Sequence, residues 1–318
     1  MDKSIILVTA VGGDIGSSAV RALRETTRII IGCDMRPYPA VRDLLDSFYV
    51  VPTAADQEAY LNSLKNIAIR NEVGFILPVS EPEIALVSDQ RKELESIGLK
   101  LMINNPTVLG TFLDKYLAAQ YLLSLGLPTP RTTLLEKYDG SFGFPLVVKA
   151  RKGHGNKKTW EIEDGEDLAY IRRKNNGLCI VQEYVGSKAE EYTTGVFSDG
   201  MNVFSITFRR QLGFGSLSAE AELVEAPYLD KVSAMISKET GLVGCINIQS
   251  RRVNDVFVIF EINPRLSSTL LFRKKFGFDD AVWWLDILQG KKNTFRKMYK
   301  SGRAVRFVSE CYFDMERL

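Results

Sequence analysis

The sequence predicts an α/β protein that begins with an open, mostly parallel sheet and continues as an α+β part. Two observations support this fold class. Apolar runs alternate with polar helical stretches over the first hundred residues, whereas the later apolar runs are joined by short loops and turns. The chain has 318 residues, 45% of them apolar and 25% charged, which is enough for two domains or one elaborated domain.

The first unit reads as a strand, a glycine turn and a helix. The apolar run over residues 5–11 leads into "GGDIGSSAVRALRE", and "RIIIGCD" then forms a second strand that ends on Asp34. Gly12, Gly13, Gly16 and Asp34 allow two interpretations. One is a dinucleotide site, with Asp34 on a ribose hydroxyl; the other is tight packing of the turn. We favour packing, because the pattern is G-G-x-x-G rather than G-x-G-x-x-G.

Three more strands are expected in the first hundred residues, at "DSFYVVP", "VGFILPVS" and "LKLMINN", with a helix over 57–70. Such alternation favours a parallel sheet covered by helices. Ser80, Glu81 and Glu83 follow a strand end, where ligand sites of open sheets gather, so they are candidates for a small-molecule pocket. Ser80 is equally suited to be an ordinary helix N-cap.

The turn cluster at 104–106 opens a helical stretch that ends at Gly126, and a linker follows. A strand over 145–149 then leads directly into a basic, glycine-containing loop, 151–158, and a second strand. Backbone N–H groups and lysines in such a loop suit the covering of phosphates, although an ordinary solvated loop is the alternative. His154, the only histidine in the chain, lies in this loop, so a hydrolase built on Ser-His-Asp or Cys-His would depend on it.

In "GLCIVQEYVGSKAEEYTTGVF", a strand exits into a linker and Glu191 opens the next strand. A strand edge of this kind can present backbone groups to a purine, and a carboxylate nearby can accept from ribose hydroxyls. Periodicity alone does not establish this site.

"LVGCINIQSRR" and "DVFVIFEIN" read as a hairpin. Alternation places Glu261 and Asn263 on one face and directs Phe260 and Ile262 into the core. Asn247 and Gln249 also share a face. A three-residue turn, 253–255, would put Asn247 opposite Glu261, and a two-residue turn would put Ile248 there.

Four oxygen-bearing side chains on a buried hairpin are costly unless something pairs with them. A divalent cation that also holds phosphate oxygens is a natural candidate, and Arg265, just beyond the strand, could reach the same phosphate. The alternative is a structural network of polar groups.

Charge and cysteine content narrow the class of protein. Forty-one Lys plus Arg against 39 Asp plus Glu give a formal charge of +2, too balanced to suggest nucleic acid or an anionic membrane as the main partner. The first apolar run is too short for a signal peptide or a membrane span. The four cysteines contain no C-x-x-C pair, which favours reduced thiols and a cytoplasmic location.

In order along nearly the whole chain, these segments resemble the ATP-grasp superfamily, and most closely one half of the carbamoyl-phosphate synthase large chain. The resemblance implies a Rossmann-like preceding domain over 1–105. It further implies an ATP-grasp domain of two α+β subdomains: a small lid subdomain with its connecting helix over 106–180, and a large subdomain with the metal site over 181–318.

The resemblance also implies roles for individual residues. Lys115, in "LDK", and Lys149, in "PLVVKA", would contact phosphates, with the loop 151–158 as the lid. The adenine hinge would comprise Glu183, Tyr184 and Val185, and Glu191 would bind the ribose, with Glu190 as the alternative.

The ending "FEINPRLSS" is the most specific match. It implies Gln249, Glu261 and Asn263 as ligands of two Mg²⁺ (or Mn²⁺) ions that bridge ATP phosphates, and Arg265 as a contact for the phosphorylated intermediate. Arg209 and Arg210 both fall where the family places basic residues near the γ-phosphate or substrate, and the sequence does not choose between them.

The implied activity is that of an ATP-dependent ligase, which converts a substrate carboxylate to an acyl phosphate and joins it to an amine or similar nucleophile. We expect small-molecule partners, neither nucleic acid nor membrane, and allow for a homodimer. Because the chain is about as long as one synthase half, carbamoyl phosphate is not the expected product. The alternatives are an NAD-dependent oxidoreductase using the first domain and a non-catalytic ATP sensor.

Overall fold

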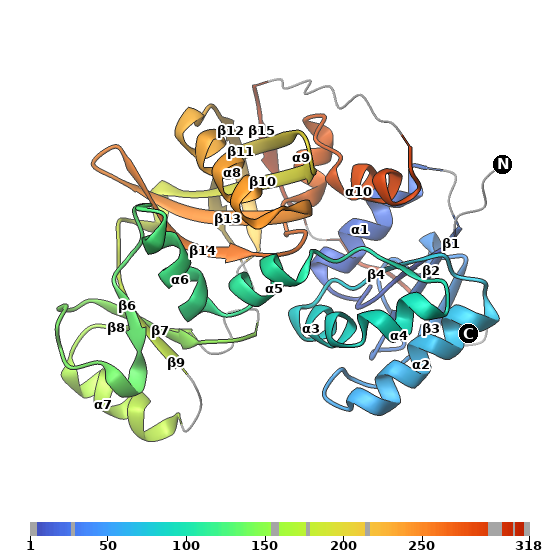
Figure 1. Cartoon of the computed structure of the whole chain (residues 1–318), viewed down its shortest axis with the longest axis horizontal. Coiled ribbons are helices and arrows are strands. Elements are labelled where there is room, and N and C mark those ends of the chain that lie inside the picture. The colour runs from blue at the N-terminus through green and yellow to red at the C-terminus, as the bar shows by residue number, and fades with distance from the viewer. Residues whose placement is uncertain are drawn as a thin grey trace.

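The computed structural model describes residues 5–26, 29–153, 159–175, 179–213, 217–291, 301–307 and 309–314. These residues form three sheets, each with its own helices (Figure 1). Among them, no helix combines the length and the apolar character needed to cross a membrane. The α/β prediction, with a parallel sheet first and antiparallel sheets after it, is confirmed.

The first sheet is parallel, with the strand order β3-β2-β1-β4-β5. Helices cover both faces, since Leu7 and Ile76 pack in one apolar cluster with α2, while Ile6 and Val8 pack in another with α1. Its elements are β1 Ile5–Val8, α1 Asp14–Arg24, β2 Ile29–Asp34, η1 Arg42–Leu44, β3 Ser47–Val50, α2 Gln57–Arg70, β4 Phe75–Leu77, α3 Glu81–Asp89, α4 Arg91–Ser96 and β5 Lys100–Leu101.

The glycine turn before α1 is held by hydrogen bonds to the side chain of Asp34. One carboxylate oxygen of Asp34 accepts from the Gly12 N–H at 2.8 Å, and the other accepts from the Arg36 N–H at 2.9 Å. A Cβ atom on Gly16 would lie 2.2 Å from the carbonyl oxygen of Ala10. Asp34 therefore stabilises the turn, and Gly16 allows the helix to approach it, which supports the packing interpretation.

Two helices connect the first sheet to the rest, α5 Pro106–Phe112 and α6 Lys115–Ser124, where the sequence predicted one helical stretch. The break occurs at Asp114, whose side chain accepts from the N–H groups of Tyr116 and Leu117 at 3.0 and 3.2 Å. A carboxylate at this position caps a new helix, so Lys115 becomes its first residue.

The second sheet is antiparallel, with the order β6-β9-β7-β8, and α7 packs on it. The strand predicted over 145–149 is present as β7. The predicted boundary at 180/181 falls inside β9, so this sheet extends to Glu183. The elements are β6 Thr132–Leu134, η2 Leu135–Lys137, β7 Leu146–Ala150, β8 Thr159–Ile162, α7 Gly165–Lys174 and β9 Cys179–Glu183.

The third sheet is antiparallel, with the order β14-β13-β10-β11-β12-β15. One face packs against α5, α6 and α8. The elements are η4 Lys188–Glu190, β10 Glu191–Asp199, β11 Val203–Leu212, β12 Ser218–Val224, α8 Pro227–Thr240, β13 Val243–Val253, β14 Val256–Asn263, α9 Leu270–Lys275, α10 Asp280–Leu288 and β15 Arg303–Val305.

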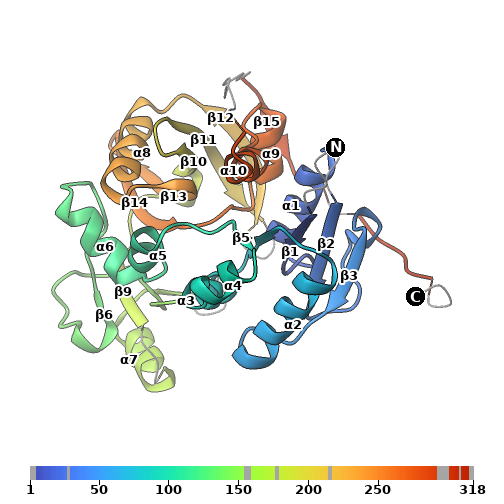
Figure 2. The ribbon, with the colours of Figure 1, turned by 45° about the vertical axis from the view of Figure 1, so that its right-hand side comes forward.

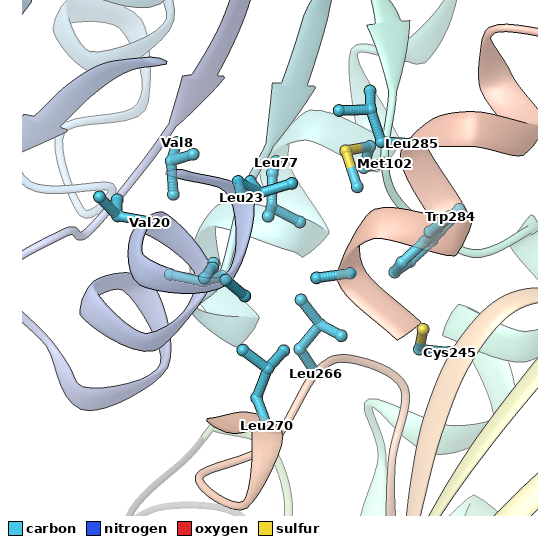
Figure 3. Close-up of a cluster of buried hydrophobic side chains, with 14 of the residues drawn as sticks. Val8, Val20, Leu23, Leu77, Met102, Cys245, Leu266, Leu270, Trp284 and Leu285 are labelled. Atoms are coloured by element: carbon cyan, nitrogen blue, oxygen red, sulfur yellow. The ribbon is translucent and has the colours of Figure 1, made fainter. Parts of the chain in front are cut away.

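The other face of the third sheet joins the first domain through a shared apolar core. Val8, Val20 and Leu23 of the first domain lie in one cluster with Leu270 and Trp284 (Figure 3). Helix α1 lies beside α9 and α10 in both ribbon views (Figures 1 and 2). Burial of this shared surface holds the first and third sheets against each other.

The hairpin β13–β14 differs from the predicted register. Its turn has two residues, Asn254 and Asp255, both with positive φ, so that Val253 lies opposite Val256. Two residues with positive φ form the turn type that best matches the twist of paired strands. Of the two turn lengths considered, the three-residue turn, with Asn247 opposite Glu261, is therefore wrong, and the two-residue turn is present.

A β-bulge at Phe260 then shifts the register by one residue. Ser250 pairs with Ile259 and Gln249 pairs with Glu261, which leaves Phe260 as the extra residue. As a result, Glu261 faces the same side as Gln249, and Asn263 the same side as Asn247. The predicted polar face is thus formed, through a different register.

Candidate functional site

A pocket of about 900 Å³ lies where the three sheets meet. It is lined by the glycine turn before α1, by β7 to β9, by the connection after β9, and by β10, β11, β13 and β14. The lining includes most of the sequence-predicted site residues, namely Lys149, Glu183, Tyr184, Val185, Glu191, Arg210, Gln249, Glu261, Asn263 and Arg265.

Lys149, which is buried, and Glu261, which is half-buried, form an ion pair in the lining of this pocket. The Lys149 ammonium lies 3.7 Å from a Glu261 carboxylate oxygen. Burial lowers the pKa of Lys149, and the charges of Lys115 and Arg251 lower it further, against the opposing effect of Glu261. Burial alone would raise the pKa of Glu261, but Lys149, Lys115 and the Asn263 amide outweigh it and hold that pKa below its ordinary value. Glu261 is therefore ionised at neutral pH.

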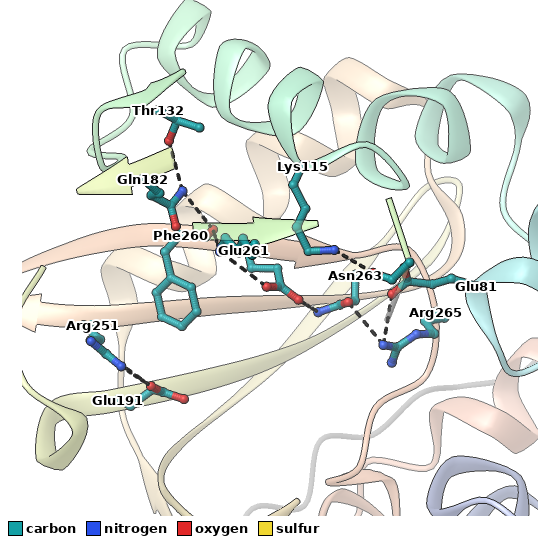
Figure 4. Close-up of polar contacts among 12 residues, drawn as sticks. Glu81, Lys115, Thr132, Gln182, Glu191, Arg251, Phe260, Glu261, Asn263 and Arg265 are labelled. Carbon is teal, nitrogen blue, oxygen red and sulfur yellow. Dashed lines mark hydrogen bonds and ion pairs between the residues drawn. The ribbon is translucent and has the colours of Figure 1, made fainter. Parts of the chain in front are cut away.

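A chain of hydrogen bonds leads from Glu261 into the first domain (Figure 4). The Asn263 amide donates to Glu261 at 3.1 Å, and Arg265 donates through Nη2 to the Asn263 oxygen at 3.2 Å. The same Nη2 donates to Glu81 at 3.1 Å. Glu81, predicted as a pocket candidate, thus contacts the site through Arg265.

Ser80 and Glu83 have mainly structural partners. The N–H and hydroxyl of Ser80 both donate to Glu83, at 3.1 and 2.7 Å, so Ser80 is the N-cap of α3. Glu83 also accepts from Thr9 and Tyr60. Ser80 nevertheless lines the pocket, so both interpretations of this residue apply.

Glu191 is held by two arginines. One carboxylate oxygen accepts from Nε and Nη2 of Arg210, and the other accepts from Nε and Nη2 of Arg251, at 2.9 to 3.2 Å. Glu191 and Arg210 are both buried. Two charge-assisted hydrogen bonds from each guanidinium hold the carboxylate in place, so these three side chains form one connected wall of the pocket.

Arg209 and Glu190 lie outside the pocket lining. Strand alternation places Arg209 on the opposite face from Arg210, where it pairs with Glu222 at 2.7 Å and Glu190 at 3.6 Å. The structure therefore brings Arg210, and not Arg209, to the pocket.

The hinge residues lie along one side of the pocket. The Glu183 side chain is directed to Arg131, at 3.0 Å, and this hydrogen-bonded partner lowers the pKa of Glu183. The Glu183 N–H donates to the Arg131 carbonyl, which continues the sheet. The carboxylate and the N–H of Glu183 are thus both paired within the protein, so neither is free for an adenine contact.

Lys115 approaches the site from α6. Its ammonium donates to the carbonyl of Gly153 at 2.7 Å, and its charge lowers the pKa of both Lys149 and Glu261. Lys115 is not among the residues that line the pocket, but its charge acts on the Lys149–Glu261 pair and its ammonium contacts the start of the predicted lid. The rest of that lid, 154–158, including His154, lies outside the described residues.

Phe260 lines the pocket. The prediction that its side chain packs in the core is therefore wrong. At a bulge two successive residues oppose one, so Phe260 escapes the alternation that would have turned it inward. The Lys149 ammonium lies 5.6 Å from the centroid of the Phe260 ring. The Phe260 carbonyl accepts a hydrogen bond from the Gln182 side chain at 3.5 Å. Phe260 therefore joins the second sheet to the third across the pocket.

The polar face of the hairpin suits Mg²⁺. Glu261 offers an ionised carboxylate, and Asn263 and Gln249 offer amide oxygens on the same face. Mg²⁺ prefers oxygen ligands and is commonly bound by one or two carboxylates together with substrate phosphates. Within the described ranges, no three His, Cys, Asp or Glu side chains gather as a metal site. These residues therefore fit an ion whose other ligands come from phosphate and water.

Arg251 is the main pocket residue that the sequence did not indicate. One arginine on a strand next to another, Arg252, reads as a solvated pair. The alternation of β13 gave the available signal, because it places Arg251 on the same face as Gln249.

Two family models match separate parts of the chain. The model described as "PylC-like, N-terminal domain" matches residues 6–102, and the model described as "ATP-grasp in the biosynthetic pathway with Ter operon" matches residues 177–311. The first match coincides with the parallel sheet, and the second begins just before β9 and extends past β15.

Curated relatives and solved structures agree with these matches. The carbamoyl phosphate synthase large chain of Ralstonia nicotianae is 24% identical over 286 residues, which cover 81% of this chain and 25% of the synthase. The D-alanine–D-alanine ligase of Xylella fastidiosa is 26% identical over 211 residues, 55% of this chain and 68% of the ligase.

A biotin carboxylase from Campylobacter jejuni, solved as a β-γ-ATP complex, shares the fold with a TM-score of 0.73 and 17% identity, over 94% of this chain and 74% of the carboxylase. The alignments to the synthases thus span only about a quarter of the synthase length. The family models thus assign residues 177–311 to an ATP-grasp family and residues 6–102 to a PylC-like N-terminal domain, and nearly the whole chain shares its fold with the carboxylase.

Proposed function

We propose that this protein is an ATP-dependent ligase that activates a substrate carboxylate and joins it to an amine. The observation that carries the proposal is the arrangement at the centre of the pocket. Lys149, Lys115 and Arg265 surround the oxygen-bearing face formed by Gln249, Glu261 and Asn263. Cations and hard oxygen ligands in one buried place suit a nucleoside triphosphate with its metal ions.

In the first step, an oxygen of the substrate carboxylate attacks the γ-phosphorus of ATP. The bond from that phosphorus to the bridging β–γ oxygen breaks, which gives an acyl phosphate and ADP. In the second step, the amine nitrogen attacks the acyl carbon, the carbon–oxygen bond to phosphate breaks, and the nitrogen loses a proton to water. The products are an amide, phosphate and ADP.

The difficulty of the first step is the approach of an anion to a polyanion. Lys149 and Lys115 would neutralise phosphate oxygens, and the buried position of Lys149 strengthens its effect because water is excluded. Mg²⁺ or Mn²⁺, held by Glu261, Asn263 and Gln249, would supply further charge neutralisation. Arg265 would bind the phosphorylated intermediate.

The acid and the amine are of small-molecule size, because the pocket holds about 900 Å³. The D-alanine–D-alanine ligase among the relatives favours a peptide-like product. A homodimer and a cytoplasmic location are also proposals; the four cysteines, all free thiols, are compatible with a reducing compartment.

The experiment is a mass-spectrometric screen of pooled carboxylic acids and amines with Mg-ATP, in which ADP and phosphate are measured alongside any condensed product. We expect ADP release that depends on an acid, and its loss in Lys149→Ala. Arg209→Ala is the matched control and is expected to retain activity. Binding of Mg-ATP without release of ADP over the whole panel would favour the ATP sensor. A thermal shift with NAD, and none with Mg-ATP, would favour the oxidoreductase.

A further inference from the structure

Arg251, on β13, makes contacts that tie the hinge to Glu191. Its Nη1 donates to the Val185 carbonyl at 3.1 Å, while Nε and Nη2 donate to one oxygen of Glu191 at 3.1 and 3.0 Å. Its side chain is only 13% exposed. One guanidinium thus fixes the distance between the connection after β9 and the first residue of β10.

The aromatic surroundings of Arg251 restrict it further. Its guanidinium carbon lies 4.9 Å from the ring centroid of Tyr184 and 5.6 Å from that of Phe260. Both rings line the pocket. Contacts of a planar cation with two aromatic rings add to the hydrogen bonds and hold the guanidinium in one orientation.

The backbone of the hinge is also seated on β13 at this place. Gly186 has a φ of +60°, and a Cβ atom there would lie 3.0 Å from a Val253 methyl and 3.3 Å from the Cβ of Arg251. This close approach of the Gly186 backbone to β13 is independent of the hydrogen bonds made by the Arg251 guanidinium. Two separate observations therefore place the hinge in a fixed position against Arg251.

Glu191 has little capacity left for a ligand. Each carboxylate oxygen accepts two N–H groups, one oxygen from Arg210 and the other from Arg251. A carboxylate has about four acceptor positions, so a ribose hydroxyl could bind only by displacing an arginine N–H. This limits the direct ribose contact that the family resemblance implies for Glu191.

We propose that Arg251 is a positioning residue that determines nucleotide specificity, by holding the hinge backbone and Glu191 at a fixed separation. The inference rests on the proposed function, since it assumes that the pocket binds ATP. A hinge that cannot shift presents fixed donors and acceptors to a purine. Adenine and guanine carry opposite groups at position 6, an amino donor and a carbonyl acceptor, so a fixed hinge discriminates between them.

The test uses the whole chain with two matched substitutions, Arg251→Lys and Arg252→Lys. Both retain the charge, but Arg252 is exposed and pairs with Glu190 at 3.2 Å, outside the pocket lining. Mg-ATP and Mg-GTP binding are measured by calorimetry, and the melting temperature of each unliganded protein is recorded. Lysine keeps the charge but lacks the planar fork of donors that Arg251 directs to the Glu191 carboxylate and the Val185 carbonyl.

We expect Arg251→Lys to weaken Mg-ATP binding about 10- to 100-fold and to narrow the preference for ATP over GTP about 10-fold, because one buried charge-assisted contact is lost. Arg252→Lys should match the unsubstituted protein. If Arg251→Lys proves too unstable, Arg251→Gln gives the same comparison. If Arg251→Lys and the unsubstituted protein bind Mg-ATP equally well and prefer ATP over GTP by the same ratio, the inference about Arg251 is overturned and the proposed function stands. If the unsubstituted protein does not bind Mg-ATP, both the inference and the proposed function are overturned.

Discussion

Arg265 and Glu81 form an ion pair across the boundary between the third sheet and the first domain, with Nη2 of Arg265 3.1 Å from a Glu81 oxygen. Both side chains are largely buried, at 13% and 6% exposure. The same nitrogen donates to Asn263, which in turn donates to Glu261. The first domain therefore reaches the proposed metal site through a single chain of hydrogen bonds.

Glu81→Gln tests this connection. The substitution keeps the shape of the side chain but removes the charge that holds Arg265. We expect acid-dependent ADP formation to fall about 10- to 100-fold, in line with the loss of about 1.5 to 3 kcal/mol from a hydrogen bond between charged groups, while Mg-ATP affinity changes little.

Glu83→Gln is the matched control for that experiment. Glu83 lies on the same helix but accepts from Thr9, Tyr60 and Ser80, all within the first domain. It should lower the melting temperature without a selective effect on turnover. Normal ADP formation by Glu81→Gln, with Arg265→Ala inactive, would show that Arg265 does not need its partner.

The lowered pKa of Glu261 makes a prediction about pH. The pKa of Glu261 in the folded protein lies below its ordinary value of 4.5, so the ionised carboxylate stabilises the folded state above that pH, and this contribution is lost as the pH falls through the lowered pKa. The Mg²⁺ concentration that gives half-maximal ADP formation should therefore stay constant from about pH 8 down to about pH 5 in so far as it depends on Glu261.

Glu261→Gln removes the charge while keeping an oxygen ligand. It should raise the half-maximal Mg²⁺ concentration at least about tenfold across that range, since a hard cation loses its one protein carboxylate. A variant with an unchanged Mg²⁺ requirement would contradict the assignment of Glu261 as a metal ligand.

Asp280 gives a second pH prediction, in the opposite direction. Burial raises the pKa of Asp280 to about 6, despite the buried Arg273 guanidinium 2.6 Å away. The folded state thus binds a proton that the unfolded state releases near pH 3.8, so this contribution to stability is present below about pH 3.8 and is lost as the pH rises through about 6. The difference of roughly two pKa units corresponds to about 3 kcal/mol at most.

Asp280→Asn, which does not titrate, should therefore change the pH profile of unfolding. The melting temperature of the unsubstituted protein, relative to that of Asp280→Asn, is expected to fall between pH 4 and pH 7. Calorimetric melts at several pH values measure it. Parallel curves for the two proteins would show that Asp280 remains ionised beside Arg273 throughout.

The sequence predicted which side chains share the polar face better than it predicted how the two strands pair. Glu261, Asn263 and Gln249 were identifiable because their spacing and residue types suit a metal face, and strand alternation groups them. The register was not identifiable, because both the positive φ of Asn254 and Asp255 and the bulge at Phe260 depend on how β14 packs against its neighbours.

Ion pairs between distant segments explain most of the remaining differences. Glu183 and Arg131 are 52 residues apart, and Glu81 and Arg265 are 184 residues apart. No local pattern indicates such partners. Strand alternation requires Arg209 and Arg210 to face opposite sides, but the choice between them required the position of Glu191, which belongs to the neighbouring strand β10.

The bulge yields the last prediction. Deleting one residue from a buried strand ordinarily turns every following side chain to the wrong face. Deleting Phe260 should instead be tolerated. Ile259 already pairs with Ser250, and Glu261 pairs with the adjacent Gln249, so the deletion leaves a regular ladder. Glu261 and Asn263 then stay on their present face.

We expect a folded protein with a cooperative melt and a normal Mg²⁺ requirement, but with weaker Mg-ATP binding, since the ring beside Lys149 and Arg251 is lost. Phe260→Ala, which keeps the bulge, is the comparison. If Phe260→Ala folds and the deletion does not, the bulge is required by the sheet itself, and its role is not confined to placing Phe260 in the pocket.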